Sequence, residues 1–314
     1  GEIMEYAKLG TSELNISTVG LGCNNFGMRL FDQEQVNTIV NTALDAGINF
    51  FDTADMYGNG MSEQMLGKAL GSRRSEVIVG TKFGMKMDDD DNKQGASRRY
   101  ILEAVEASLT RLGSDYIDLY QVHFPDPETP ISETLETLNE LVTAGKVRFI
   151  GNSNFTGDMV TEAEKAAEAN GTVKFVSAQN HYNLITRGIE EDVTSAASAI
   201  GLSVIPYFPL ASGFLTGKYQ PGVAPPEDSR MTAWGMADST LTDENFSILG
   251  KLEAFAKKRN HTVLDLAMGW LLSHSYVPSV ISGATKPNHV ISNVEAASWQ
   301  LNAEEMDEVN AITS

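Results

Sequence analysis

Short apolar runs alternate with amphipathic patterns along most of the chain. The runs are rich in β-branched and aromatic residues, which is typical of buried strands, and the patterns between them have the spacing of helices. The eight predicted strands are TVGLGC (18–23), INFFDTA (48–54), VIVGTK (77–82), IDLYQVH (117–123), FIGNSN (149–154), FVSAQN (175–180), LSVIPYF (202–208) and SVISGA (279–284). The eight predicted helices lie near residues 33–46, 62–70, 98–112, 131–144, 157–169, 189–199, 263–273 and 287–297.

Eight strand–helix repeats favour a closed α/β barrel with parallel strands, a (β/α)8 TIM barrel, over a doubly wound sheet in two domains. No linker rich in Pro, Gly or Ser divides the 314 residues, so we expect a single domain over residues 1–314.

Three features lie outside the repeat. Tyr6 to Ser17, with the turn-like LGTSEL, predicts an N-terminal β-hairpin that closes the lower end of the barrel. Lys218 to Asn245 is too long for an ordinary loop and is expected to carry function. Helices near 246–258 and 303–312 would be added to the outer ring.

Ionisable residues end three consecutive predicted strands. Asp52, Lys82 and His123 come at these ends, and Tyr57 follows Asp52 by five residues. Singly, they fit a turn cap, a strand-end lysine, a core histidine and a loop aromatic. Together they would meet at the carboxyl ends of the strands, where barrels have their active sites, and such burial is costly unless the charges are paired. We therefore predict one site.

These residue types suggest acid catalysis on a carbonyl group. The pKa of free tyrosine is about 10, and a neighbouring ammonium lowers it by favouring the phenolate. Lys82 could supply this cation for Tyr57, with Asp52 holding Lys82 in place. His123 could donate a hydrogen bond to a carbonyl oxygen or assist the proton transfer.

The amino-acid composition limits the kinds of partner that the protein is expected to bind. The 23 Lys and Arg residues against 42 Asp and Glu give a net charge of −19, which repels phosphate backbones and anionic lipids. We thus expect no nucleic-acid and no membrane partner. There is no apolar run of about 20 residues and no leader, and the single cysteine, Cys23, fits a reducing compartment, so we predict a soluble cytoplasmic protein. The five histidines lack metal-ligand spacing, so no metal is expected.

Several segments resemble the aldo-keto reductases. FDTADMYG (51–58), GTKFG (80–84) and HFPD (123–126) resemble the segments that carry this family's Asp, Tyr, Lys and His tetrad. IGNSNF (150–155), SAQNHYN (177–183), PYFPLASGFLTGKY (206–219) and SGATKPNHVISN (282–293) resemble its cofactor segments, so the resemblance covers nearly the whole chain. It implies a (β/α)8 barrel and an NAD(P)H-dependent oxidoreductase that reduces aldehydes or ketones by hydride transfer. A small-molecule carbonyl compound would be the substrate.

The resemblance also implies residue roles. Tyr57 would donate the proton, Lys82 would lower its pKa, and Asp52 would hold Lys82, while His123 would orient the carbonyl. The residues implied at the cofactor are Cys23, Asn24, Asp52, Ser153, Asn154, Gln179, Tyr207, Phe208, Pro209, Leu210, Ser212, Gly213, Lys218, Gly283, Thr285, Lys286, His289 and Asn293. Among them, Ser153, Asn154 and Gln179 would bind the carboxamide, and Tyr207 would stack on the nicotinamide.

The adenosine end departs from the family pattern. His289 stands where Arg or Gln is usual, and Ser292 where Glu is frequent. If Lys286 reaches the 2′-phosphate, NADPH is favoured and NADH is the less suited cofactor, because an acidic chain needs a local cation to hold an extra dianion. The alternative is a solvated lysine after the last strand. Neither G-x-G-x-x-G nor a P-loop occurs, so the cofactor would be bound by barrel loops.

Substrate contacts are expected from loops above the tetrad, chiefly residues 84–97 and 218–245. The residues predicted to contact substrate are Asn25, Met56, Tyr57, Met85, His123, Phe124 and Trp234. Most are apolar, and methionine makes such a lining adaptable. The acidic run Asp88 to Asp91 is interpreted as a solvated loop tip that would disfavour anionic substrates.

Two other functions fit parts of the sequence. Lys82 could form a Schiff base in an aldolase-like barrel, but that needs a depressed lysine pKa, and a paired Asp52 would raise it. Alternatively, the chain could be a nucleotide-binding regulatory subunit, like the channel-associated β subunits of the family, with little turnover. The physiological substrate, reaction direction and oligomeric state stay open.

Overall fold

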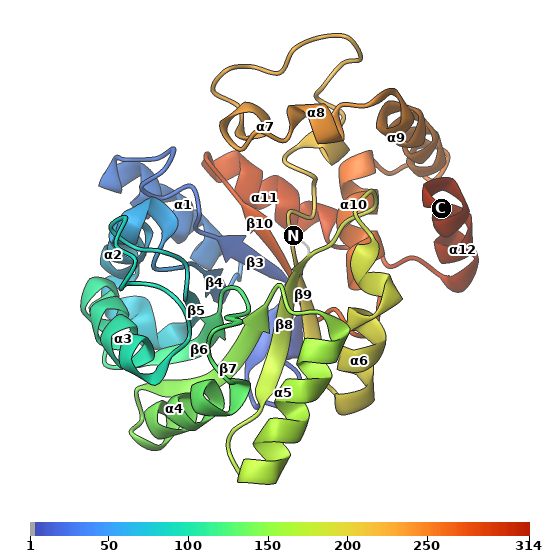
Figure 1. Cartoon of the computed structure of the whole chain (residues 1–314). Coiled ribbons are helices and arrows are strands. Elements are labelled where there is room, and N and C mark those ends of the chain that lie inside the picture. Colours follow the sequence, from blue (N-terminus) through green and yellow to red (C-terminus); the bar gives the residue numbers. More distant parts are fainter. Residues whose placement is uncertain (1–3) are drawn as a thin grey trace.

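The computed structural model describes residues 4–314. Eight parallel strands form one sheet in the order β10-β3-β4-β5-β6-β7-β8-β9. The strands are β3 (Val19–Gly22), β4 (Phe50–Asp52), β5 (Ile78–Phe83), β6 (Ile117–Val122), β7 (Val147–Ser153), β8 (Phe175–His181), β9 (Ser203–Tyr207) and β10 (Val280–Gly283). The two end strands, β9 and β10, lie side by side, which makes the sheet a nearly closed barrel (Figure 1). The predicted fold class is confirmed.

A ring of helices surrounds the barrel (Figure 1). The helices that follow the strands are α1 (Gln33–Asp45), α2 (Met61–Leu70), α3 (Arg98–Leu112), α4 (Ile131–Thr143), α5 (Gly157–Asn170), α6 (Val193–Ile200), α10 (Val263–Leu272) and α11 (Pro287–Ala296). Their ends follow local chemistry: the Ser97 hydroxyl accepts from the Tyr100 N–H at the start of α3, and Gly113 ends that helix in the left-handed conformation.

One predicted helix is divided. The pattern over 189–199 predicted a continuous helix, but a 3-10 turn, η3 (Gly188–Glu191), precedes α6. Between them, Asp192 has the non-helical angles φ −143° and ψ −47°. Its carboxylate accepts from the backbone N–H of Gly157 at 2.7 Å, at the start of α5. The bond to a neighbouring helix outweighs the local helical pattern.

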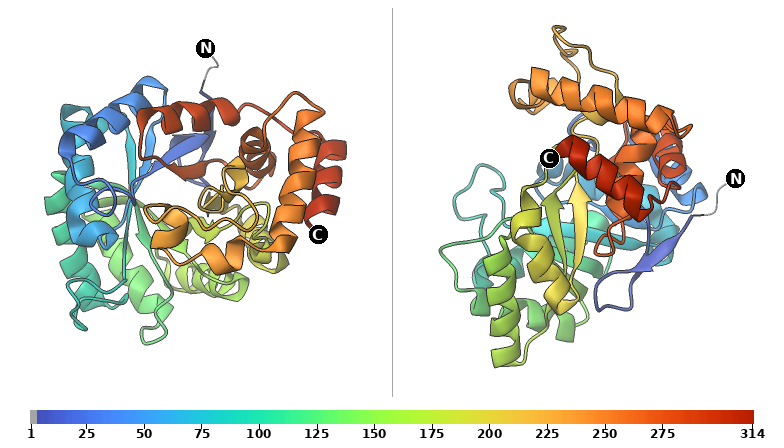
Figure 2. Two further views of the ribbon diagram at one scale, coloured as in Figure 1. Left: turned by 90° about the horizontal axis from the view of Figure 1, so that it is seen from above. Right: turned by 90° about the vertical axis from the view of Figure 1, so that its right-hand side faces the viewer.

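The N-terminal hairpin closes one end of the barrel. Strands β1 (Tyr6–Lys8) and β2 (Asn15–Ser17) pair antiparallel, as predicted. Figure 2 shows this hairpin (blue) far from the long segment 218–245 (yellow to orange). Leu9, Leu14 and Ile16 form a buried cluster with the strand residues Phe50, Ile78, Leu119, Val176, Ile205 and Ile281. The hairpin therefore fills the end opposite the polar strand ends.

The segment 218–245 and the chain end add further helices. Two short helices, α7 (Arg230–Ala233) and α8 (Ala237–Thr240), interrupt the segment that was expected to be one long loop. Helix α9 (Asp243–Lys257) begins earlier than predicted, because the Thr242 hydroxyl caps it by accepting from Asn245 N–H. It lies beside α12 (Ala303–Thr313) at the edge of the molecule (Figure 1).

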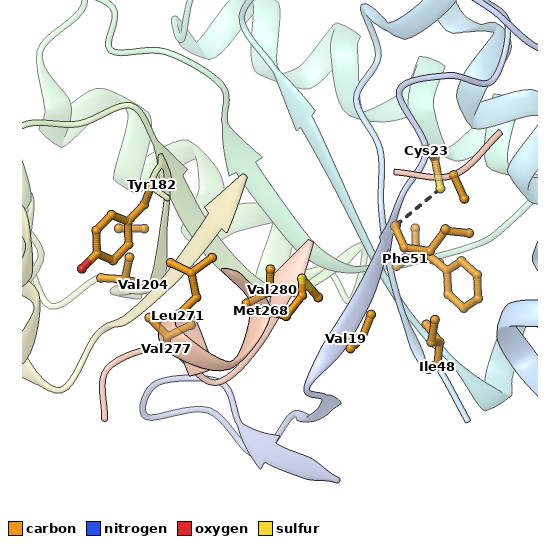
Figure 3. Packing of buried hydrophobic residues seen from close by; sticks show 14 of the residues in the cluster. Val19, Cys23, Ile48, Phe51, Tyr182, Val204, Met268, Leu271, Val277 and Val280 are labelled. Carbon is orange, nitrogen blue, oxygen red and sulfur yellow. Dashed lines mark hydrogen bonds between the residues drawn. The ribbon is translucent and has the colours of Figure 1, made fainter. Parts of the chain in front are cut away.

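The main core lies between the barrel wall and the helices. Figure 3 shows part of it, with Val204, Met268 and Val280 packed between strands and α10. Burial of these apolar side chains is the main stabilising contribution, about 1.5–3 kcal/mol for each large one. None of the helices described in residues 4–314 has the length and apolar character needed to cross a membrane.

Candidate active site

The structure brings the four predicted ionisable residues together at the carboxyl ends of β4, β5 and β6. Lys82 Nζ lies 2.6 Å from Asp52 Oδ2 and donates to the Thr53 carbonyl at 2.9 Å. It also reaches the Tyr57 hydroxyl at 3.3 Å. The rings of Tyr57 and His123 meet edge to face, with centroids 5.9 Å apart. A continuous chain of polar contacts thus joins a carboxylate, an ammonium and a phenol.

The backbone around Tyr57 needs small residues. Tyr57 opens the short turn η1 (Tyr57–Gly60), in which Gly58, Asn59 and Gly60 all have positive φ values of 58°, 51° and 96°. A Cβ on Gly58 would come within 2.8 Å of the Gly27 carbonyl oxygen. This strained turn holds the phenol over the strand ends, where such strain is typical of functional loops.

Two amides lie beside the Asp52–Lys82 pair. Asp52 Oδ1 accepts from Gln121 Nε2 at 3.1 Å and from Gln179 Nε2 at 3.0 Å. Gln179 was expected at the cofactor, and it does reach the pocket, but its nitrogen supports Asp52. Gln121 was not predicted, although it precedes His123 by two residues, and strand alternation directs both to the same side of the sheet. Asp52 is thereby fully hydrogen-bonded.

Burial and pairing set the charge states. Burial disfavours the charge on Lys82, but Asp52 and Tyr57 outweigh it and raise the Lys82 pKa to about 12. Burial raises the pKa of Tyr57 above its usual value, and Lys82 lowers it only in part. Lys82 thus lowers the Tyr57 pKa in the expected direction, but burial, whose extent the sequence does not reveal, raises it more. Burial and then Lys82 depress the pKa of His123, which is neutral at pH 7.

A cavity of about 360 Å³ opens above these residues. The predicted residues that line it are Cys23, Asn24, Asp52, Met56, Tyr57, Met85, His123, Phe124, Ser153, Asn154, Gln179, Tyr207, Phe208, Pro209, Trp234 and Gly283. Lys82 lies beneath the lining, completely buried. Gly22, Met28, Arg230 and Ile281 also line the cavity and were not predicted. Of these, Arg230 lies in the segment expected to carry function, but nothing in its local pattern marks it.

One wall of the cavity is a connected polar and aromatic unit. Tyr207 donates its hydroxyl to Asn154 Oδ1 at 2.7 Å, and Asn154 Nδ2 donates to the His123 carbonyl at 3.0 Å. The Ser153 hydroxyl donates to the Gln179 carbonyl at 2.8 Å. His181, at the end of β8, stacks on Tyr207 with centroids 5.4 Å apart. These contacts fix the Tyr207 ring, so the wall is rigid before any ligand binds.

The other predicted cofactor residues lie outside the cavity. They are Leu210, Ser212, Gly213, Lys218, Thr285, Lys286, His289 and Asn293. Burial, then Arg230 and Arg29, lower the pKa of Lys218, while burial, Lys286 and Lys218 are the main causes that lower the pKa of His289. These residues therefore form a cluster, called here the cation cluster, which consists of the cations Arg29, Lys218, Arg230 and Lys286 and the imidazole of His289. Arg29 was not predicted.

The cluster has the character of an anion site. The charged or titratable neighbours that shift the Arg230 pKa, which burial lowers to about 10, are Arg29 and Tyr219, and neither is a carboxylate. Phe208, Ala211 and Ser212 all have positive φ, which is unusual for residues with side chains. Successive backbone N–H groups in such turns form concavities that bind anions. The phosphates of a dinucleotide fit this combination.

Asn25 lies elsewhere than expected. It was predicted at the substrate, but it is completely buried and does not line the cavity. A Cβ on Gly283 would lie 3.2 Å from Asn25 Nδ2 and 2.6 Å from Arg230 Nη2, so a glycine is needed for these groups to converge. Both polar atoms of the Asn25 side chain lack a hydrogen-bond partner within residues 4–314. A buried amide without partners, beside an unpaired guanidinium, is suited to a polar ligand.

Barrel, strand-end site and cation cluster together define an α/β-barrel protein with a buried Asp–Lys–Tyr centre. A family model described as Aldo/keto reductase family matches residues 18–314, and the chain belongs to this family. Membership supports an oxidoreductase for small-molecule carbonyl compounds in general, and aldo-keto reductases generally use NAD(P)H. No group of three or more metal-ligating side chains occurs in the described part of the chain.

Similar proteins cover nearly the whole chain. Aldo-keto reductase YhdN of Bacillus subtilis (strain 168) is 35% identical over 315 residues, which is 98% of this chain and 93% of the relative. A probable voltage-gated potassium channel subunit beta of Oryza sativa subsp. japonica is 35% identical over 319 residues, with coverages of 98% and 96%. The solved structure of a glycerol dehydrogenase from Gluconobacter oxydans superposes with a TM-score of 0.86 at 29% identity, covering 98% of this chain and 94% of that chain.

The convergence of Asn25 and Arg230 on Gly283 can be tested. Gly283→Ala introduces a methyl group at the point where these side chains meet, so affinity for NAD(P)H, the cofactor that the family generally uses, should fall by about tenfold or more, equivalent to ~1.4 kcal/mol. Gly250→Ala is the control, because a Cβ there meets nothing within 4 Å. Both variants are titrated with the reduced cofactor by fluorescence. Equal affinity in the two would show that the approach of Asn25 and Arg230 to Gly283 has no part in binding.

Proposed function

We propose that this protein is an NADPH-dependent reductase that converts aldehydes or ketones to alcohols, with Tyr57 as the general acid. The observation that carries the proposal is the contact chain from Asp52 through Lys82 to the Tyr57 hydroxyl, at 2.6 and 3.3 Å, at the floor of an otherwise largely apolar cavity. A buried ammonium next to a phenol has little structural value by itself, since it must be desolvated. It is suited to stabilising a phenolate that forms transiently.

The reaction divides between the cofactor and the protein. When bound, the reduced nicotinamide supplies the hydride. Tyr57 donates its proton to the carbonyl oxygen, and the Lys82 ammonium, with its pKa raised to about 12 against the cost of burial, stabilises the resulting phenolate. A high Tyr57 pKa keeps the phenol protonated and ready to donate. His123, neutral because of burial, donates a ring N–H to the carbonyl oxygen and orients it.

Lys82 chemistry argues against the aldolase-like alternative. A Schiff-base lysine attacks as the neutral amine, which requires a depressed pKa. Burial does act in that direction, but the Asp52 carboxylate at 2.6 Å outweighs it, so the amine stays protonated.

The cation cluster favours NADPH over NADH. A chain with a net charge of −19 places Arg29, Lys218, Arg230 and Lys286 close together, and the 2′-phosphate gives them a dianion to bind. Ser153 and Asn154 would bind the carboxamide, Tyr207 would stack on the nicotinamide, and the 208–213 turn would hold the pyrophosphate. Asn25 joins the cofactor residues in place of its expected substrate role.

The substrate side of the cavity is apolar. Met28, Met56, Met85, Phe124 and Trp234 line it, and the one ammonium near the reacting position, Lys82, is already engaged by Asp52. None of these five residues is charged, and Arg230, which also lines the cavity and whose Cζ lies 5.7 Å from the centre of the Trp234 ring, belongs to the cation cluster that would bind the cofactor. We therefore assign uncharged, apolar aldehydes or ketones, to which methionine side chains adapt easily.

A second candidate is a nucleotide-binding regulatory subunit with little turnover. The relative described as a potassium channel subunit beta, at 35% identity over 98% of this chain, favours it. The two functions share the cofactor site and differ in turnover. Cytoplasmic localisation is retained as part of the proposal, on the basis of the single, buried Cys23.

Replacing the phenol tests the acid. Tyr57→Phe should reduce carbonyl turnover by about 10²–10⁴-fold or more, because proton donation is lost, while NADPH affinity stays within about twofold. Reduction of an apolar aldehyde is followed through the absorbance of NADPH, and binding through its fluorescence. Full activity in the variant would exclude Tyr57 as the acid. If the unmodified protein binds NADPH but turns over no member of an aldehyde and ketone panel, the regulatory candidate is favoured.

Cofactor choice depends on the cation cluster. Lys286→Ala should weaken NADPH by about tenfold and NADH by less than about threefold, because only NADPH carries the 2′-phosphate. Lys251→Ala, at an exposed position of α9, is the charge-matched control. Equal losses for the two cofactors, measured by fluorescence titration, would contradict a role of Lys286 in selecting NADPH.

A further inference from the structure

Two buried carboxyl groups bracket the turn that presents Tyr57. Asp55 precedes Tyr57 by two residues, and Glu63 follows it by six, near the start of α2. Their exposed fractions are 1% and 0%, and neither lines the cavity. The proposed mechanism gives them no role, although a buried acid has to be justified by a partner or a proton.

One guanidinium lies near both acids and contacts one of them. Arg111, on α3, donates to Glu63 Oε1 through Nε at 3.2 Å and Nη2 at 3.0 Å. Its side chain also packs on the Tyr57 turn, because a Cβ on Gly60 would lie 2.7 Å from Arg111 Cδ. Lys82 is the other cation near Asp55, but it is paired with Asp52. With Glu63 ionised against Arg111, a charge on Asp55 would be uncompensated.

The surrounding groups offer Asp55 no further positive charge. The phenols of Tyr120 on β6 and Tyr100 on α3 also lie near Asp55. Burial, followed by the charge of Asp55, raises the pKa of both phenols, so they are neutral. Four buried oxygens of this cluster lack hydrogen-bond partners among the described residues: Asp55 Oδ1, Glu63 Oε2, Thr81 Oγ1 and Tyr120 Oη. The two hydroxyls can each donate one hydrogen bond and accept others, and a proton on one carboxyl supplies an additional donor.

Asp55 is the acid that keeps the proton. Burial, then the nearby Glu63, raise the pKa of Asp55 to about 8, and Arg111 and Lys82 only partly reverse this. Glu63 has the direct contact with Arg111, whereas Asp55 has none. Burial also raises the pKa of Glu63, but Arg111 and the hydroxyls of Ser108 and Thr81 act against this rise. Of the two acids, Asp55 is therefore the one that holds a proton beside the guanidinium.

We propose that Asp55 is a positioning residue that acts in its protonated form. As a neutral acid it lets Arg111 hold Glu63 and pack on Gly60 without a second negative charge beside them, and this holds the Tyr57 hydroxyl against Lys82. Ionisation of Asp55 places a second negative charge beside Glu63 and loosens the segment. Its effect on turnover rests on the proposed function, but the buried proton does not.

The sign of the pH effect follows from the two states of the chain. The folded protein keeps the Asp55 proton up to a pH of about 8, whereas the unfolded chain releases it near 4. Between these values the folded state binds one more proton, so the stability contributed by Asp55 declines as pH rises through this window. Tyr57, with a pKa raised above its usual value, and Lys82, at about 12, titrate later. Asp55 thus sets the alkaline limit of activity.

Infrared spectroscopy detects the proton directly. Between pH 6 and 10, the wild-type protein should show a carboxylic acid C=O band that disappears with a midpoint near 8 and is absent from Asp55→Asn. Asp115→Asn, which removes an exposed aspartate, should keep the band. Glu63→Gln leaves Asp55 as the only acid facing Arg111, so the midpoint should move to lower pH. Loss of the band in Glu63→Gln but not in Asp55→Asn, or no band at pH 7, would overturn the proposal.

Turnover separates positioning from a general structural role. Wild-type kcat for reduction of an aldehyde should fall about tenfold per pH unit above the infrared midpoint. Asp55→Asn cannot ionise and should remain active past pH 9, while Asp55→Ala should lower kcat at every pH with little change in the KM for NADPH. Parallel pH profiles for wild type and Asp55→Asn would refute the positioning role. If no substrate is turned over, the infrared result still decides whether Asp55 holds the proton.

Discussion

The site depends on one buried ion pair, that between Lys82 and Asp52. An ammonium and a carboxylate buried at 1% and 4% side-chain exposure are stable only if their remaining hydrogen-bonding capacity is met. The Thr53 carbonyl does this for Lys82, and the amides of Gln121 and Gln179 do it for Asp52. Each comes from a different part of the barrel wall. The closed barrel is therefore what allows a permanent positive charge to lie beside the Tyr57 phenol.

Positively charged and apolar side chains lie on different sides of the cavity. The chain is strongly acidic, yet the cation cluster gathers at one side of the cavity, while the substrate side is lined by methionine and aromatic side chains. In the proposed function, an anionic cofactor is attracted to the first side and an uncharged carbonyl compound to the second. The reacting carbon would meet both above Tyr57. Arg111 contacts Glu63 and packs on Gly60 in the turn that presents Tyr57.

Much of the fold could be predicted because it depends on the regular spacing of apolar residues along the sequence. The eight parallel strands, the outer helices and the N-terminal hairpin are confirmed, and strand ends were enough to bring Asp52, Lys82 and His123 together. The helix predicted over 189–199 is interrupted at Asp192 by a contact to α5, which no local pattern reveals. The family resemblance supplied most of the cavity-lining cofactor residues.

What could not be predicted lies in irregular segments or depends on burial. Arg29 comes from a loop and Arg230 from the first residue of the short helix α7. Neither segment has a regular spacing of apolar residues, so tertiary contacts set the directions of these side chains. The burial of Asn25 beside Gly283, away from the lining of the cavity, also depends on tertiary contacts. The direction of the Tyr57 pKa shift required the extent of burial, which outweighs the nearby Lys82. Gln121, in contrast, could have been found from strand alternation.

The most direct test of this account is the protonation state of Lys82. Nitrogen NMR of the protein labelled at its lysine side chains, with Lys82→Met to assign the signal, gives the pKa of this ammonium. Although burial acts against the charge, the contacts with Asp52 and Tyr57 should keep Lys82 protonated up to a pKa of about 12. Asp52→Asn removes the paired charge and should lower the value by several units. A wild-type Lys82 that is neutral at pH 9 would contradict the account.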